Sequence, residues 1–482
     1  MQNVEPNNDS LSKNVTLEEF GWALSKVLEE SPEARTLLKN EALKKINFDY
    51  DVLYLLVKDI ELNDGSTLKG LLSKHADKST LEMIENQIPT LTIFVPSLPN
   101  KSFSAEVWNV DIDKPHVAID IKEEGKVLYI KNTESFYKGY DEIPLFPVVV
   151  VKKNERIIER KLKAGTDLKN NIEGTNLYFI DGVFNKQLAG NKIVKSSGRG
   201  PSFTPNTKTI EAYNKTKSNN GWQRDYIYYN IVNPQDRGAF NKRYIEKLVG
   251  FRILPTQDGR GKPIYDKLAD QTQTGDPVYG YFKDKSGRHG YRWTSGDFEF
   301  QVRVILGSKS PTGNESVKYF FAKPDDLFYF VYETVGSGRG STTDYTKIKD
   351  IACQPGFYNP NLELFAWDLN VFSSQYKIEI EEVDSDEETT QTSTTTYEYA
   401  TNFNFDVTKG ETIKIGSKFG ASAKATFQTA FTLKIKKGSD KLGDVIIDFG
   451  EPLINSSTGT SYDMYKYGTG GNFELYLDVI SK

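Results

Sequence analysis

The residues that most often carry catalysis are sparse in this chain of 482 residues. Its 3 histidines, His75, His116 and His289, lie too far apart for the paired spacing of a zinc hydrolase. The single cysteine, Cys353, excludes an internal disulfide and a multi-cysteine zinc site, and we expect a buried, inert thiol. We therefore predict a protein that is not an enzyme and has neither catalytic residues nor a cofactor. A hydrolase built from carboxylates far apart in the sequence is the alternative.

One acidic run has the chemistry of a cation site. Asp384, Asp386 and Glu388 alternate along the acidic segment 381–388, and calcium takes about six to eight oxygen ligands. The run lacks the glycine and the distal glutamate of an EF-hand loop. These three residues are candidate calcium ligands, and a solvated acidic turn is the alternative.

Aromatic residues gather in the segment 289–293, which contains Tyr291 and Trp293. Exposed aromatic rings can stack on a sugar, so these two residues are candidates for a glycan-binding surface. Aromatic residues of a β-domain core explain the same pattern.

The longest pattern in the chain runs from residue 397 to residue 435. Apolar residues occupy most odd-numbered positions and polar residues most even-numbered ones, which is typical of an extended strand with two different faces. A polar break at 408–411 separates two matching stretches, 397–407 and 412–422, and predicts a hairpin. The apolar positions assigned to its membrane-facing column are Tyr397, Tyr399, Phe403, Phe405, Val407, Ile413, Ile415 and Phe419.

Each stretch of this hairpin is long enough for a membrane-spanning strand, which needs about 9–11 alternating residues. Such strands cross a bilayer only in a closed barrel, so several copies of the chain would have to assemble. The hydroxyl-rich run 389–396 before the hairpin suits a segment that leaves one sheet and joins another. The alternative is an ordinary sandwich hairpin whose apolar face covers a core.

The elements that position these residues indicate an α+β fold. Leu17, Phe20 and Leu24 share one helix face, and a helical region with a small sheet precedes β-sandwich-like antiparallel domains with a long amphipathic hairpin. The apolar run 147–151 is typical of a strand covered on both faces. Alternation over 298–306 and 376–380 predicts half-buried strands. The predicted regions are a leader at 1–15, helices at 16–90, a small β-rich region at 91–195, a linker at 196–221, a middle domain at 222–350 and a C-terminal β domain at 351–482.

The composition of the chain limits the classes of binding partner and the cellular locations to consider. The formal net charge of −5 lacks the strongly basic character of a nucleic-acid-binding domain. No apolar run is long enough for a membrane-spanning helix, and the N-terminus has no signal-peptide core. A polar leader suits a tether, so we expect a secreted or cell-surface protein.

Two resemblances support this expectation. The Ser/Thr-rich alternating hairpin resembles the insertion region of aerolysin-type β-pore-forming toxins, including the epsilon-toxin and mosquitocidal-toxin group. The whole chain resembles a family of uncharacterised bacterial secreted or surface proteins, commonly lipoproteins, although it lacks a lipobox cysteine. The segments that carry this second resemblance are 48–54 (FDYDVLY), 146–156 (FPVVVVKKNER), 367–369 (WDL) and 418–422 (KFGAS).

The hypothesis that follows is a secreted, toxin-like protein that binds a cell-surface receptor or glycan, forms a homo-oligomer and inserts its 397–435 hairpin into a membrane. The second hypothesis is a surface-exposed binding or adhesion module that never enters a membrane. A glycan is one candidate ligand for such a module.

Overall fold

The structure is a computed structural model. It describes residues 8–47, 49–119, 126–139, 142–154, 156–159, 171–179, 203–218, 222–232, 237–238, 240–269, 282–283, 289–290, 297–308, 314–334, 345–369, 371–383, 388–400, 413–414, 424–436, 440–459, 461–468 and 471–482. The chain forms two compact units. Unit 1 comprises Met1–Ile193, Tyr265–Asp297 and Phe330–Ile351, and unit 2 comprises Val194–Ile264, Phe298–Tyr329 and Ala352–Lys482. The predicted middle region, 222–350, contributes to both units.

Helices dominate the start of unit 1. They are α1 (Asn8–Glu30), α2 (Pro32–Ala42), α3 (Tyr54–Val57), α4 (Leu68–Leu72) and α5 (Lys78–Gln87), with a short 3-10 turn, η1 (Pro99–Lys101). Ser31 caps α2, because its hydroxyl accepts a hydrogen bond from the Ala34 amide at 3.1 Å and Pro32 occupies the first helical position. Within the described residues, no helix has both the length and the apolar character needed to span a bilayer.

A six-stranded sheet forms the centre of unit 1, in the order β1-β2-β7-β3-β4-β5. Its strands are β1 (Asp51–Leu53), β2 (Leu91–Phe94), β3 (His116–Ile119), β4 (Lys126–Lys131), β5 (Glu134–Gly139) and β7 (Val148–Lys153). Val148 to Val151 are buried on both faces of β7, as the continuous apolar run predicts. Helix α1 packs against β3 and β4.

Two segments that are far apart in the sequence, 48–54 and 146–156, meet at one end of this sheet. Lys152 forms an ion pair with Asp51 at 3.3 Å, and Arg156 forms one with Asp49 at 3.7 Å. The side-chain amide of Asn154 donates to Asp51 at 3.0 Å. All five residues are buried, so these charges compensate one another in the interior of unit 1.

Further elements lie between the sheet of unit 1 and the last part of the chain. They are β6 (Ile143–Pro144), β8 (Ile157–Glu159), β9 (Leu177–Phe179), α9 (Lys262–Leu268), β12 (Phe282–Lys283), β13 (His289–Gly290), α10 (Pro324–Leu327), β16 (Phe328–Thr334) and β17 (Tyr345–Cys353).

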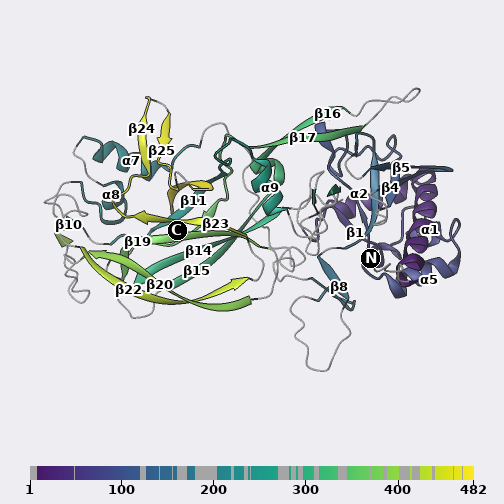
Figure 1. Ribbon diagram of the computed structural model, residues 1–482, viewed down its shortest axis with the longest axis horizontal. Coiled ribbons are helices and arrows are strands. Elements are labelled where there is room, and N and C mark those ends of the chain that lie inside the picture. Colours follow the sequence, from purple (N-terminus) through teal and green to yellow (C-terminus); the bar gives the residue numbers. More distant parts are fainter. Residues whose placement is uncertain are drawn as a thin grey trace, which may run out of the picture. The chain divides into compact units, whose positions relative to one another are not determined.

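Unit 2 is built around two antiparallel sheets (Figure 1). The first has the order β18-β11-β26, with β18 (Leu362–Glu363), β11 (Tyr244–Ile253) and β26 (Phe473–Ser481). The second has the order β15-β14-β19-β23, with β15 (Asn314–Ala322), β14 (Phe298–Ser308), β19 (Phe372–Glu382) and β23 (Asp440–Asp448). Phe251 of the first sheet contacts Phe300 and Phe320 of the second, with ring centroids 5.3 and 5.1 Å apart. An aromatic core therefore joins the two sheets.

Further elements of unit 2 lie around these sheets. They are α7 (Thr207–Thr216), α8 (Gln223–Tyr229), β10 (Arg237–Gly238), β20 (Glu388–Ala400), β21 (Ile413–Lys414), β22 (Lys424–Lys436), β24 (Ile454–Ser457) and β25 (Tyr462–Met464). The structure combines helices with many antiparallel strands in several sheets, which confirms the predicted α+β fold class.

Candidate functional site: a hairpin over a polar sheet face

Two antiparallel strands, β20 and β22, include both ends of the predicted hairpin segment 397–435, whereas most of the predicted arms 397–407 and 412–422 lie outside the described residues. Each strand has 13 residues, and within the described part of the chain the two strands form a sheet of their own. The register places Tyr397 opposite Phe427 and Tyr399 opposite Ala425. Strand β20 begins at Glu388, so the hydroxyl-rich run 389–396 belongs to the hairpin rather than to a connection before it.

The observed register differs from the one that a turn at 408–411 predicts. That turn would have set Tyr397 opposite Ser422, an odd position opposite an even one. In the structure every pair joins two odd or two even positions, for example Ser393 with Phe431 and Thr392 with Thr432. Directly opposed residues of an antiparallel pair share a face, so only such a register keeps the apolar column of the sequence together.

The four-stranded sheet next to the hairpin has one apolar face. Val302 and Val304 of β14 pair with Ile380 and Ile378 of β19, and all four are fully buried. This face contributes Phe300 to the aromatic core of unit 2. The alternation over 298–306 and 376–380 therefore predicts this face correctly.

The opposite face of the same sheet is polar, and its centre is also buried. Gln301 and Arg303 of β14 lie opposite Glu381 and Glu379 of β19, and each of the four is at most 6% exposed. Towards the edge of the sheet the burial ends, because Ile446 of β23 is 49% exposed. The strands predicted to be half-buried are thus buried on both faces at the centre of the sheet.

Arg303 is the centre of the charges on this polar face. Its guanidinium forms an ion pair with Glu315 of β15 and lies 3.6 Å from Glu379 and 3.8 Å from Glu381. Lys377 also forms an ion pair with Glu379. Burial raises the pKa of Glu381 above its ordinary value, although the nearby Arg303 acts in the other direction. The face is therefore a charged network held away from water.

The hairpin lies against this part of unit 2. Strand β20 lies close to β19, and β22 lies close to β15. Figure 1 shows β20 and β22 running alongside β14 and β15. Because β14 lies between β15 and β19 and its other face belongs to the aromatic core, we place the hairpin over the polar face.

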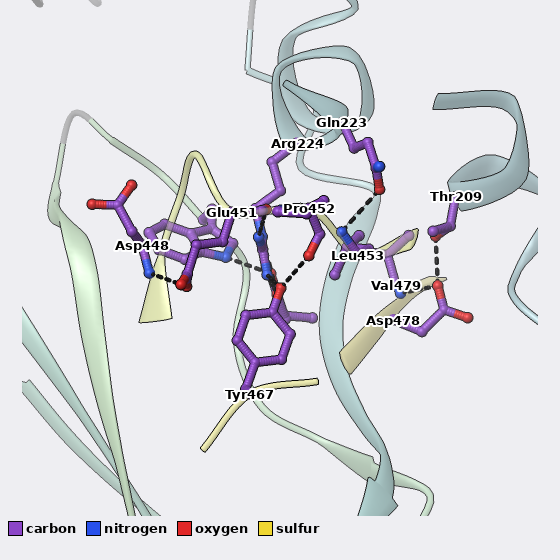
Figure 2. A network of polar contacts seen from close by, with 12 residues as sticks. Thr209, Gln223, Arg224, Asp448, Glu451, Pro452, Leu453, Tyr467, Asp478 and Val479 are labelled. Carbon is purple, nitrogen blue, oxygen red and sulfur yellow. Dashed lines mark hydrogen bonds and ion pairs between the residues drawn. The ribbon is translucent and has the colours of Figure 1, made fainter. Parts of the chain in front are cut away.

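A buried ion pair anchors helix α8 to the body of unit 2, and Figure 2 shows Arg224 of this pair beside Tyr467. Arg224 and Glu246 are both fully buried, and the Arg224 Nε donates to the Glu246 carboxylate at 3.1 Å. The same carboxylate accepts hydrogen bonds from the Trp367 indole and the Tyr228 hydroxyl. Arg224 also donates to the Tyr467 hydroxyl at 3.1 Å. Since a buried charge is costly without its partner, α8 and β11 are strongly coupled.

Neighbouring contacts fix α8 further, as Figure 2 shows. The Gln223 side chain accepts hydrogen bonds from the Leu453 and Ile454 amides, each at 2.9 Å, and donates to the Ile454 carbonyl at 2.7 Å. On β26, Asp478 accepts a hydrogen bond from the Thr209 hydroxyl of α7. Burial raises the pKa of Asp478 to about 6. Helices α7 and α8 are therefore held by buried polar contacts rather than by apolar packing alone.

A short strand pair joins the connecting segment of the hairpin to the chain that follows α8. Ile413 and Lys414 of β21 pair with Gly238 and Arg237 of β10. Phe240, two residues after β10, packs against Tyr229 with ring centroids 5.7 Å apart. The Asn241 amide donates to the Tyr228 carbonyl at 2.7 Å. Both ends of the segment that contains β10 are therefore fixed on α8.

The predicted hairpin residues divide between described and undescribed positions. Tyr397 and Tyr399 lie in β20, and Ile413 lies in β21, paired with β10. Phe403, Phe405, Val407, Ile415 and Phe419 lie outside the described residues.

The other candidate sites are mostly outside the described residues as well. Asp384 and Asp386 of the calcium hypothesis lie there, whereas Glu388 is the first residue of β20, opposite Lys436. Tyr291 and Trp293 of the glycan hypothesis also lie there. Among the side chains that the structure describes, no group of three histidine, cysteine or acidic residues is placed to hold a metal ion.

Sequence reasoning did not identify the polar face or the anchor of α8. Gln301 and Arg303 occupy the positions of β14 that were expected to face water, and Arg224 and Glu246 stand in no recognisable motif. One signal for the polar face was present in the sequence, namely the length of the alternating hairpin. A two-stranded hairpin is only marginally stable by itself, so it needs another surface to pack against.

Comparison with family models, curated proteins and solved structures found no match to this chain.

Proposed function

We propose that this protein acts on membranes by releasing the hairpin β20–β22 from unit 2 and inserting it, together with the hairpins of other copies, as part of a β-barrel pore. The observation that supports this proposal is the polar face of the β15-β14-β19-β23 sheet. We further propose that the protein acts as a secreted or surface protein, after it binds a receptor or glycan on a cell.

The polar face makes release of the hairpin inexpensive. A hairpin that covers an apolar core exposes that core when it leaves, at about 25 cal/mol per Å² of apolar surface. Here the surface left behind carries Arg303, Glu379 and Glu381, which water solvates well. The aromatic core around Phe251 lies on the other side of the sheet. Unit 2 therefore keeps its core after the hairpin leaves.

The dimensions of the hairpin suit a bilayer. Each strand has 13 residues, which at about 3.4 Å per residue span about 44 Å. A membrane-spanning strand needs about 9–11 residues. A two-stranded hairpin is only marginally stable by itself, so the released form needs a new partner. Hairpins from other copies satisfy the backbone groups at both of its edges.

The test uses neighbouring substitutions of opposite parity in β22. We would compare Phe431→Lys with Thr432→Lys for dye release from vesicles prepared from plasma-membrane fractions, which retain receptors. A lysine on the lipid side of a membrane strand costs about 2–4 kcal/mol near the bilayer midplane, whereas one on the water side costs little. The parent and Thr432→Lys should release dye, and Phe431→Lys should not, with circular dichroism confirming that all three are folded.

Two results would count against the proposal. If the parent releases no dye from any membrane, the hairpin is an ordinary part of a β-sandwich and the protein is a surface-binding module. If the two variants release dye equally well, the face of β22 that carries Phe431 is not the face that contacts lipid.

A further inference from the structure

The pair β10–β21 has a position that the proposed function does not explain. Strand β21 stands near the middle of the sequence between the end of β20 at Ala400 and the start of β22 at Lys424. A hairpin enters a bilayer with its connecting segment first, because that segment must reach the far side. In this structure the two described residues of the connecting segment, Ile413 and Lys414, are instead paired with β10.

The partner strand, β10, follows a helix that buried contacts hold in unit 2. Strand β10 follows α8, whose residues are all buried, and the chain returns to α8 through Phe240 and Asn241. The Arg224–Glu246 ion pair joins α8 to β11. A force that lifts the hairpin would therefore act through β10 on a chain that contacts α8 at Phe240 and Asn241.

We propose that β10 and β21 form a latch that holds the connecting segment of the hairpin on unit 2, and that this latch must open before the hairpin leaves the sheet. This inference rests on the proposed function, because opening of the latch is the step that controls release of the hairpin. The latch consists of two residue pairs, Arg237 with Lys414 and Gly238 with Ile413. Backbone hydrogen bonds over two pairs bias the closed state by about 5- to 150-fold, which restrains the segment but still permits opening.

The test is a reversible covalent lock. In a Cys353→Ala background, Gly238→Cys is combined with Ile413→Cys, and Arg237→Cys with Lys414→Cys in a second protein. Successive antiparallel pairs have Cα separations of about 4.5 and 5.5 Å, and both values fall within the range that a disulfide accepts. Mass spectrometry confirms that the disulfide has formed.

The matched control places a disulfide inside the hairpin. Thr394 and Ala430 are Cα partners, so Thr394→Cys with Ala430→Cys ties β20 to β22 without tying either strand to β10. This control should behave as the parent does in dye release, because the hairpin moves as one piece, and in hydrogen exchange it shows how much a disulfide within the hairpin slows exchange by itself.

The first measurement is hydrogen exchange of residues 388–400 and 424–436 in solution, which needs no membrane. The oxidised latch proteins should exchange at least about 5-fold more slowly than their reduced forms. The second measurement is dye release from vesicles prepared from plasma-membrane fractions. Oxidation should reduce the rate of release at least about tenfold, and reduction should restore it.

The two proposals fail in different ways. If the parent releases no dye but oxidation slows exchange of the hairpin, the latch is supported and the pore proposal is not. If the parent and the oxidised latch proteins release dye equally fast, the latch inference is wrong and the pore proposal stands. Equal exchange in the oxidised and reduced forms would also overturn the latch.

Discussion

Replacing Glu246 with glutamine removes the carboxylate that balances the buried charge of Arg224. The side chain keeps its shape, but the guanidinium on α8 loses its ion-pair partner in a fully buried site. The Trp367 indole and the Tyr228 hydroxyl lose a charged acceptor at the same time. Hydrogen bonds to a charged group are stronger than those to a neutral one, so three contacts weaken together.

The expected loss of stability is large. Breaking a buried pair from one side costs about 3–5 kcal/mol, because the remaining charge stays desolvated. Domains of ordinary stability have about 5–15 kcal/mol in total. Replacing both partners by apolar residues, Arg224→Met with Glu246→Leu, removes the uncompensated charge. This double variant should lose less stability than Glu246→Gln alone, by more than about 1 kcal/mol.

The assay is urea denaturation followed by tryptophan fluorescence. With an m-value of about 2.5 kcal/mol per M, the midpoint for Glu246→Gln should fall by about 1–2 M while m stays constant. A fall of less than about 0.4 M, or a double variant less stable than the single one, would refute the view that this ion pair holds α8. Because α8 supports the latch, exchange of residues 388–400 should also become faster in Glu246→Gln.

Two further predictions concern the pH dependence and the packing of unit 2. Burial raises the pKa of Asp225 to about 8 from its ordinary 3.8, so its contribution to stability is fully present below about pH 4 and is lost as the pH rises through 8. The free energy of unfolding of the parent should therefore fall by at most about 6 kcal/mol between pH 4 and pH 8, and Asp225→Asn should remove this fall. Identical urea midpoints of parent and variant at pH 5 and at pH 9 would contradict this. Gly261→Ala should cost about 1–3 kcal/mol, because its new Cβ would lie 2.6 Å from the backbone carbonyl carbon of Ala352. Gly356→Ala, whose Cβ meets no atom within 4 Å, should leave the thermal midpoint nearly unchanged, and equal effects of the two substitutions would contradict the packing argument.

The elements of the fold whose signals are local could be predicted from the sequence. The start of α2 is signalled by Ser31 as the N-cap and Pro32 at the first helical position. The uniformly apolar run 148–151 indicates that both faces of β7 are covered. The alternation between residues 397 and 435 likewise predicts extended strands, and its described ends lie in the paired strands β20 and β22. In each case the information lies within a few residues of the element it describes.

The polar face beneath the hairpin could not be predicted in this way. Gln301 and Arg303 alternate with apolar residues as the solvent side of any one-sided sheet does, yet both are buried in the folded chain. The coupling of Arg224 to Glu246 likewise joins residues whose partnership shows only in three dimensions. The predicted turn at 408–411 lies outside the described residues, and the register of β20 with β22 is known only from the strands on either side of it.

The central claim is that the hairpin leaves the sheet and meets lipid on one face only. The most direct measurement labels single cysteines at Thr429, Ala430, Phe431 and Thr432 of β22, in the Cys353→Ala background, with a dye whose emission reports the polarity around it. On addition of vesicles from plasma-membrane fractions, the emission should shift to the blue at 429 and 431 and stay unchanged at 430 and 432. Emission that is the same with and without membranes at all four positions would contradict the claim.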